Sequence, residues 1–219
     1  ICDNRKRKDS WCPEDTRRLK SLLGELENDV DKALYYARSD TVCQDYMIRE
    51  IPLKEVVLAA IHRIQSYLIQ NGAVIDMQVG DVNVYCDDKW LEFIISQIMI
   101  NAVKYKKDEG CRITIRTQKE DQKTILSIED NGIGIRPEEL GRIFDKGFTG
   151  TNGRQNRQST GIGLYLCMKL SRKLGITLDA QSEAGVCTRI ILVFPDGSRY
   201  FGRAVSYTHL RAHETLSDL

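Results

Sequence analysis

Residues 111–135 read CRITIRTQKEDQKTILSIEDNGIGI. Apolar and polar residues alternate over 111–119 and again over 123–129, which predicts two strands joined by a short turn. The motif DNGIGI follows at 130–135. Its glycines allow the backbone to approach a flat ligand, and the Asp130 carboxylate can accept hydrogen bonds from an exocyclic amine. The same letters also fit an ordinary turn.

The segment before this hairpin is predicted to be a long helix that is capped by Asp87 or Asp88 and runs to about Lys106. One face carries polar side chains at spacings of three and four: Gln97, Asn101, Lys104 and Tyr105. The opposite face is apolar and is expected to be core: Phe93, Ile94, Ile98, Met99 and Ala102. An amide oxygen suits Mg²⁺ and an ammonium suits phosphate, although a solvated helix face has the same composition.

A third cluster, STGIGL at 159–164, opens a predicted helix over 161–174 after a polar stretch at 136–160. Backbone amides at the start of a helix bind phosphate, especially where glycine lines them. The motif is neither a Walker loop nor a dinucleotide fingerprint after a strand. An ordinary capped helix is the alternative interpretation.

The remaining pattern predicts an α+β fold, a two-layer sandwich rather than a regular βαβ sheet. The other expected elements are a helix at 14–39, a strand at 45–51, a helix at 53–70, a hairpin of strands 74–79 and 82–86, and strands 176–181 and 186–194. The first helix has an apolar stripe that includes Leu19, Leu22, Leu26 and Val30. Such a stripe requires a partner helix, expected upstream or in a second copy.

Composition narrows the function. The 219 residues include 32 basic and 31 acidic side chains, so bulk charge gives no case for nucleic acid. Seven cysteines without a CxxC pair and three histidines argue against a disulfide framework or a zinc site. No apolar run approaches the roughly 20 residues of a membrane span.

Together the motifs resemble those of bacterial sensor histidine kinases. The resemblance covers about 14–195 and rests on four motifs in order: NAxKY (the N box), DNGIGI (the first glycine box), IFxxGFTG (the F box) and TGIGLYL (the second glycine box). The segments LYYAR, EIPL and KGFTG are most similar to the intramembrane-sensing kinases that accompany peptide-antibiotic ABC transporters.

The resemblance implies a Bergerat ATP-binding fold with ATP and Mg²⁺ as cofactors. On the adenine side, Asp130 would read the amine, and the other residues implied there are Gly132, Gly134, Ile135 and Thr188. On the phosphate side, Asn101 would hold Mg²⁺, and Lys104 and Tyr105 would contact phosphates. Gly161 and Gly163 would turn backbone amides toward the phosphates, and Leu164 is a further implied cofactor-binding residue. Residues 136–160 would form a lid anchored by Phe144 and Phe148, with Arg154 or Arg157 toward the γ-phosphate.

Gln97 favours a kinase over the related gyrase-like and chaperone ATPases. Gyrase-like and chaperone ATPases carry a Glu there that activates water, and a Gln is not a general base. A kinase must avoid activating water before its acceptor histidine arrives, which suits a Gln. Gln97 is therefore grouped with Asn101 and Lys104 as an expected catalytic residue of a kinase. A gyrase- or chaperone-like ATPase and a non-catalytic interaction module are the alternatives.

The implied protein is an ATP-dependent histidine kinase that transfers the γ-phosphoryl group to a histidine and then to a response regulator. The expected domains are 1–43 (the end of a dimerisation hairpin), 44–203 (the ATP-binding domain) and 204–219 (a non-native or disordered tail). The phosphoacceptor histidine is expected on a preceding helix, so this chain should not label itself, and His62 is not a substitute. The other expectations are a homodimer through the 14–39 helix, an ABC transporter permease as a partner, and a cytoplasmic location in a bacterial plasma-membrane protein.

Overall fold

The computed structural model describes residues 13–40, 46–151 and 160–197. A five-stranded mixed sheet is its centre, in the order β2 (Ala73–Gln78), β4 (Cys111–Glu120), β5 (Lys123–Asp130), β7 (Cys187–Pro195) and β6 (Thr177–Glu183). Strand β2 runs parallel to β4, and the other neighbours are antiparallel. The predicted 111–129 hairpin is therefore confirmed as β4 and β5.

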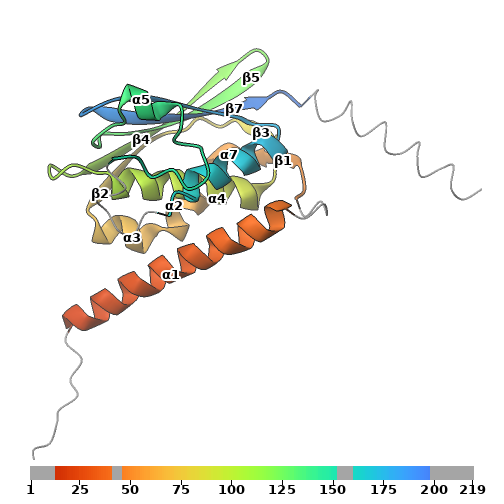
Figure 1. Ribbon diagram of the computed structural model, residues 1–219. Helices are drawn as coiled ribbons and strands as arrows, with labels where there is room; N and C mark the ends of the chain where they lie inside the picture. The colour runs from red at the N-terminus through yellow and green to blue at the C-terminus, as the bar shows by residue number, and fades with distance from the viewer. Residues whose placement is uncertain (1–12, 41–45, 152–159, 198–219) are drawn as a thin grey trace, which may run out of the picture.

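Helices cover one face of this sheet, as Figure 1 shows. They are α2 (Leu53–Arg63), α3 (Gln65–Gln70), α4 (Asp88–Lys104) and α7 (Gly163–Lys173). The short helix α5 (Pro137–Leu140) and a small antiparallel pair, β1 (Arg49–Pro52) with β3 (Asn83–Cys86), complete the described elements. Alternate residues of β4 and β5 are buried beneath the helices. The α+β two-layer sandwich predicted from the sequence is confirmed.

Helix α4 is the central element of the helical layer. The Asp87 carboxylate caps it by accepting from the Trp90 backbone N–H at 2.9 Å, so the first of the two predicted caps is the one used. The other Asp87 oxygen accepts from the Met47 N–H at 2.8 Å. The apolar face predicted to be core is buried: Phe93, Ile94, Ile98, Met99 and Ala102.

The predicted hairpin of strands 74–79 and 82–86 is wrong. Strand β2 pairs with β4, whereas β3 pairs with β1 in the separate small sheet. The chain does turn between them, because the Val82 N–H donates to the Gly80 carbonyl at 3.0 Å. The Gly80 N–H donates to the Thr117 hydroxyl of β4 at 2.8 Å, so the turn is held by a distant strand. The two strands leave this turn into different sheets.

Two other boundaries differ from the prediction. The helix expected over 53–70 is interrupted at Ile64, whose φ of −107° and ψ of 15° leave the helical region and separate α2 from α3. No Gly or Pro marks this break, and Ile64 itself is buried. The strand expected at 45–51 is shorter and ends at Pro52. The strands at the end of the chain and α7 lie within two residues of their predicted bounds.

Helix α1 (Pro13–Asp40) lies across the helical layer on the side away from the sheet (Figure 1). Its Tyr35 ring stacks on Phe93 of α4 with centroids 4.1 Å apart. The predicted apolar stripe faces outward, and its exposed members include Leu19, Leu22, Leu26 and Val30. Among the described residues no second helix covers that stripe. None of the helices in the described ranges combines the length and apolar character that crossing a bilayer requires.

Candidate functional site

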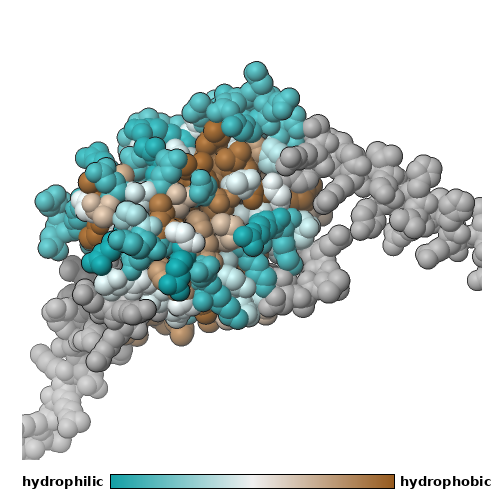
Figure 2. Space-filling model, turned by 45° about the horizontal axis from the view of Figure 1, so that its top comes forward, coloured by the Kyte–Doolittle hydropathy of each residue, from teal (hydrophilic) through white to brown (hydrophobic). Residues whose placement is uncertain are grey.

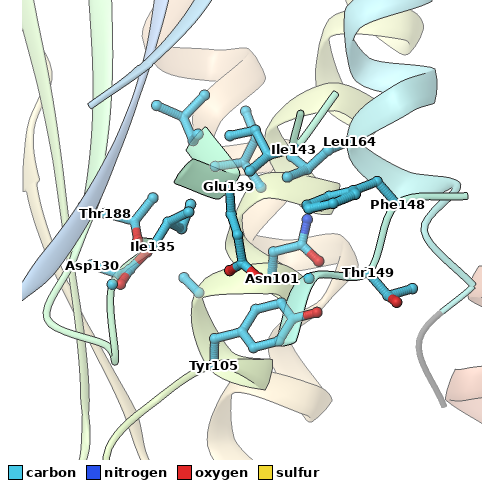
Figure 3. Close-up of a pocket in the computed structure, with 15 residues that line it drawn as sticks. Asn101, Tyr105, Asp130, Ile135, Glu139, Ile143, Phe148, Thr149, Leu164 and Thr188 are labelled. Carbon is cyan, nitrogen blue, oxygen red and sulfur yellow. The ribbon is translucent and has the colours of Figure 1, made fainter. Parts of the chain in front are cut away.

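A cavity opens where the ends of β5 and β7 approach α4 and the segment after α5. It comprises about 770 Å³ of space between the side chains, part of which is open solvent. Figure 3 shows Asp130 and Thr188 on the strand side, Asn101 and Tyr105 on the helix, and Phe148 and Thr149 opposite the strands. On the face seen in Figure 2, hydrophobic residues gather in a central area bordered by hydrophilic ones.

Asp130 ends β5 and lies beside Thr188 of β7 in the sheet register. Its Oδ1 accepts from the Gly132 backbone N–H at 2.8 Å. Burial raises the pKa of the Asp130 carboxyl to about 6, an effect that backbone N–H donors partly oppose. A carboxylate that is this buried and borders a cavity is typical of ligand recognition.

The glycine-rich loop after β5 is fastened to β6. The Ile135 N–H donates to the Ser182 hydroxyl at 2.8 Å, and that hydroxyl lies 3.2 Å from the Thr188 hydroxyl. Gly134 has a φ of +64°, and a Cβ there would lie 2.1 Å from the Glu183 carbonyl oxygen. Only glycine fits this position, so the loop brings its backbone against the sheet edge and to the cavity wall.

A second cavity adjoins the first one. The two share lining residues, among them Asn101, Tyr105, Phe148 and Leu164. The second cavity adds polar and glycine positions from three helices and the segment before α7: Lys32, Gln97, Lys104, Thr160, Gly161 and Gly163. Its described lining residues include the ammonium groups of Lys32 and Lys104 and no carboxylate.

Gly161 joins the segment before α7 to the F-box segment. Its φ is +64°, and a Cβ would lie 2.4 Å from the Gly147 carbonyl carbon. The Gly147 N–H donates to the Gly161 carbonyl at 3.1 Å. This glycine is therefore required by backbone packing in addition to any contact with a ligand.

Gln97 is buried on α4, with 3% of its surface exposed. Its Nε2 donates to Oδ1 of Asn28 on α1 at 2.5 Å. Its carbonyl oxygen lies beside Gly163, where an added Cβ would be 3.3 Å away. The side chain is thus fixed between α1 and the start of α7 and presents no carboxylate to the cavity.

Most of the sequence-predicted site residues meet at these two cavities. Asp130, Gly134, Ile135 and Thr188 line the first, and Asn101, Tyr105, Phe148 and Leu164 line both. Gly132 and Phe144 line neither. Gly132 packs against the Tyr105 carbonyl, and Phe144 packs against the core. Arg154 and Arg157 lie outside the described residues.

Glu139 of α5 was not predicted, although it projects into the first cavity (Figure 3). Its Oε1 accepts from the backbone N–H and the hydroxyl of Thr151, both at 2.7 Å. Ile143 and Thr149 were also missed, and both line the two cavities. A Glu in a short PEEL helix has no sequence signal for such a role, because it depends on how the chain folds back.

Comparison with known families agrees with this geometry. Residues 86–198, which contain both glycine motifs and α4, match the family described as "Histidine kinase-, DNA gyrase B-, and HSP90-like ATPase". The chain belongs to this ATPase family. It therefore carries an ATP-binding domain, and the matched residues include both Asn101 and Asp130 of the first cavity.

The curated relatives of this chain include several sensor kinases. The chain is 39% identical to the sensor protein BceS of Bacillus subtilis over 76% of this chain and 49% of that protein. It is 33% identical to the sensor histidine kinase YxdK of the same organism, over 80% of this chain and 54% of the relative. It is 36% identical to the sensor protein kinase GraS of Staphylococcus aureus, over 90% of this chain and 58% of the relative. Its homologues are thus sensor histidine kinases, and the chain spans about half their length.

Solved structures support the fold. The mycobacterial sensor histidine kinase MprB aligns with a TM-score of 0.58 at 22% identity, over 68% of this chain and 97% of that one. Full-length ShkA in complex with AMPPNP aligns with a TM-score of 0.65 at 20% identity, over 85% of this chain and 40% of that one. Both alignments support the fold described above and, at these identities, nothing beyond it.

Proposed function

We propose that this chain is the nucleotide-binding and catalytic part of a sensor histidine kinase, which binds ATP–Mg²⁺ and presents the γ-phosphoryl group to a histidine. The observation that supports this most is the convergence of Asp130, Asn101 and both glycine motifs on two adjoining cavities. The identity of 39% and 33% to two sensor kinases supports this choice within a family that also includes gyrase B and HSP90.

On the strand side the purine is recognised. The Asp130 carboxylate accepts a hydrogen bond from the exocyclic amine of adenine, and Thr188 lies beside it in the register. Gly134 and Ile135 form the floor, and apolar lining from Ile98 of α4 packs on the ring. This side of the pocket binds and orients the base.

On the helix side the triphosphate is held. Lys104 supplies a cation and Gly163 supplies a backbone amide, and both line the second cavity. Mg²⁺ fits this donor set, because it usually binds one or two protein oxygens together with phosphate oxygens, and the Asn101 amide borders both cavities. When bound, the ion neutralises phosphate charge.

Gln97 explains why this pocket favours transfer over hydrolysis. It occupies the helix face one turn before Asn101, is held by Asn28, and has no group able to take a proton from water. Catalysis is then a matter of positioning and charge stabilisation until the acceptor arrives. A gyrase- or chaperone-like ATPase requires a base at this position, so that alternative is disfavoured.

The parent protein's activity is part of the same proposal. A histidine of the intact kinase receives the phosphoryl group, which then passes to a response regulator. The outward apolar stripe of α1 pairs in a homodimer, the ATP-binding domain lies in the cytoplasm, and an ABC transporter permease is a partner of the intact kinase. Residues 1–43, 44–203 and 204–219 remain the proposed division of the chain.

Nucleotide binding gives the direct test. Isothermal titration with AMPPNP and Mg²⁺ should give saturable binding to the 219-residue chain, and Asp130→Asn should weaken it at least about tenfold, since one charge-assisted hydrogen bond contributes about 1.5–3 kcal/mol. Asp121→Asn, an exposed turn carboxylate between β4 and β5, is the control. Equal affinity in the Asp130 variant would remove the adenine-reading role, and no binding by the parent chain would remove the function.

A further inference from the structure

We propose that Lys32 of α1 is a further nucleotide-binding residue, which adds a cation to the phosphate end of the pocket. This inference rests on the proposed function. It adds to the ATP-binding domain a residue that comes from the preceding helix.

The docking of α1 places Lys32 at the pocket. Tyr35 stacks on Phe93 of α4, and Arg63 of α2 forms ion pairs with Asp31 of α1 and with Glu92 of α4. Near the end of the helix, the Tyr36 hydroxyl accepts from Lys146 Nζ at 2.7 Å. These contacts fix the same face of α1 that carries Lys32, because positions 28, 31, 32, 35 and 36 repeat at helical spacing.

Lys32 then borders the second cavity together with Asn101, Lys104 and Gly163. Its side chain is 19% exposed. A nucleoside recognised by Asp130 in the first cavity has its phosphates toward the second, since Asn101 and Tyr105 line both. The phosphates therefore enter a cavity that is lined by two lysines, Lys32 and Lys104.

The ion pair that Lys32 forms with Asp29 is weak enough for a phosphate to replace the carboxylate. Lys32 Nζ lies 2.9 Å from Oδ1 of Asp29, three residues earlier on α1, and that carboxylate is 64% exposed. An exposed ion pair of this kind contributes little, whereas phosphate oxygens in a partly enclosed cavity attract an ammonium more strongly. Phosphate and Asp29 thus compete for one cation.

A titration series tests this at one fixed, low ionic strength. Lys32→Ala should weaken AMPPNP binding to the full chain about three- to tenfold and leave adenosine binding within about twofold, because adenosine has no phosphate. Lys54→Ala is the matched control, since Lys54 is also paired with an aspartate, Asp81, at 3.2 Å. Neither Lys54 nor Asp81 lines either cavity. Lys32→Arg should restore most of the AMPPNP affinity.

Removal of the competing carboxylate should act in the opposite direction. Asp29→Asn should tighten AMPPNP binding about twofold in the parent chain and have no effect in the Lys32→Ala background. Asp81→Asn, the matched control, should change neither. Circular dichroism melting verifies that each variant is folded.

The outcomes separate this inference from the proposed function. Unchanged AMPPNP affinity in Lys32→Ala, or an equal loss for AMPPNP and adenosine, overturns the role of Lys32 while the ATP pocket stands. Failure of the parent chain to bind AMPPNP at all overturns the proposed function instead.

Discussion

Burial shapes the chemistry of Asp130 before any ligand is bound. The residue ends β5 beneath the glycine loop, and the pKa of its carboxyl is raised to about 6 because desolvation outweighs the donors from Gly132 and Thr188. The folded chain therefore keeps a proton between about pH 4 and 6 that the unfolded chain releases.

This raised pKa makes the stability of the folded chain depend on pH. The folded state should lose about 3 kcal/mol of stability through Asp130 as the pH rises through that window, since a tenfold change in proton affinity corresponds to about 1.4 kcal/mol. Urea unfolding of the parent chain and of Asp130→Asn at pH 4.5 and 7.5 should detect about 2 kcal/mol of this loss, because pH 4.5 already lies above the unfolded pKa. The free energy of unfolding of the Asn variant, relative to that of the parent chain, should be higher at pH 7.5 than at pH 4.5. A relative free energy that does not change with pH would contradict the prediction.

Cavity residues that belong to a local motif were predictable from the sequence. Asn101, Asp130 and Gly134 each stand in a short pattern that already indicates their role, and each lies at the cavities. Glu139 could not be found in this way, because its contact with Thr151 depends on a chain reversal. The contact between Gln97 and Asn28 could not be found either, because Asn28 stands 69 positions earlier in the sequence, on another helix.

At the scale of elements, α4 and the β4–β5 hairpin were predictable because their signals are local. A capping aspartate starts the helix, and period-two alternation with a short turn joins neighbouring strands. The β2–β3 hairpin was wrong because the sequence signal shows that the chain turns but does not show which strand is the partner. The break at Ile64 also has no local sequence signal, since neither Gly nor Pro stands there.

The cap of α4 gives the prediction at this scale. Asp87→Ala should lower the free energy of unfolding by about 2 kcal/mol, because it removes the cap at Trp90 and also leaves the Met47 N–H without its carboxylate partner. Urea denaturation measures the change. Asp88→Ala, which removes an exposed ion pair with Arg49, should cost under about 1 kcal/mol. Equal costs would show that capping does not set the start of α4.

At the scale of the whole molecule, α1 is held by a few aromatic and charged contacts rather than by a continuous core. The stack of Tyr35 on Phe93 is the closest ring contact of the described residues, and the Tyr35 hydroxyl also donates to the Lys89 carbonyl at 3.3 Å. Loss of such a contact loosens an element without unfolding the domain.

Hydrogen exchange tests this hierarchy. Tyr35→Ala should speed amide exchange in α1 about three- to tenfold and leave β4, β5 and β7 unchanged, since an aromatic pair contributes about 0.5–1.5 kcal/mol beyond its area. Leu34→Ala is the matched control, because Leu34 is the neighbouring residue and is 49% exposed. The same acceleration in both variants, or its spread to the sheet, would contradict a specific docking role for Tyr35.

The outward apolar stripe of α1 has a consequence for assembly. Leu22, Leu26 and Val30 lie on the side of the helix opposite to Lys32 and Tyr35. Helix α1 can therefore pack against a second molecule through its outward leucines while its other face stays packed on its own ATP-binding domain. The two interfaces use different side chains, so forming one does not require breaking the other.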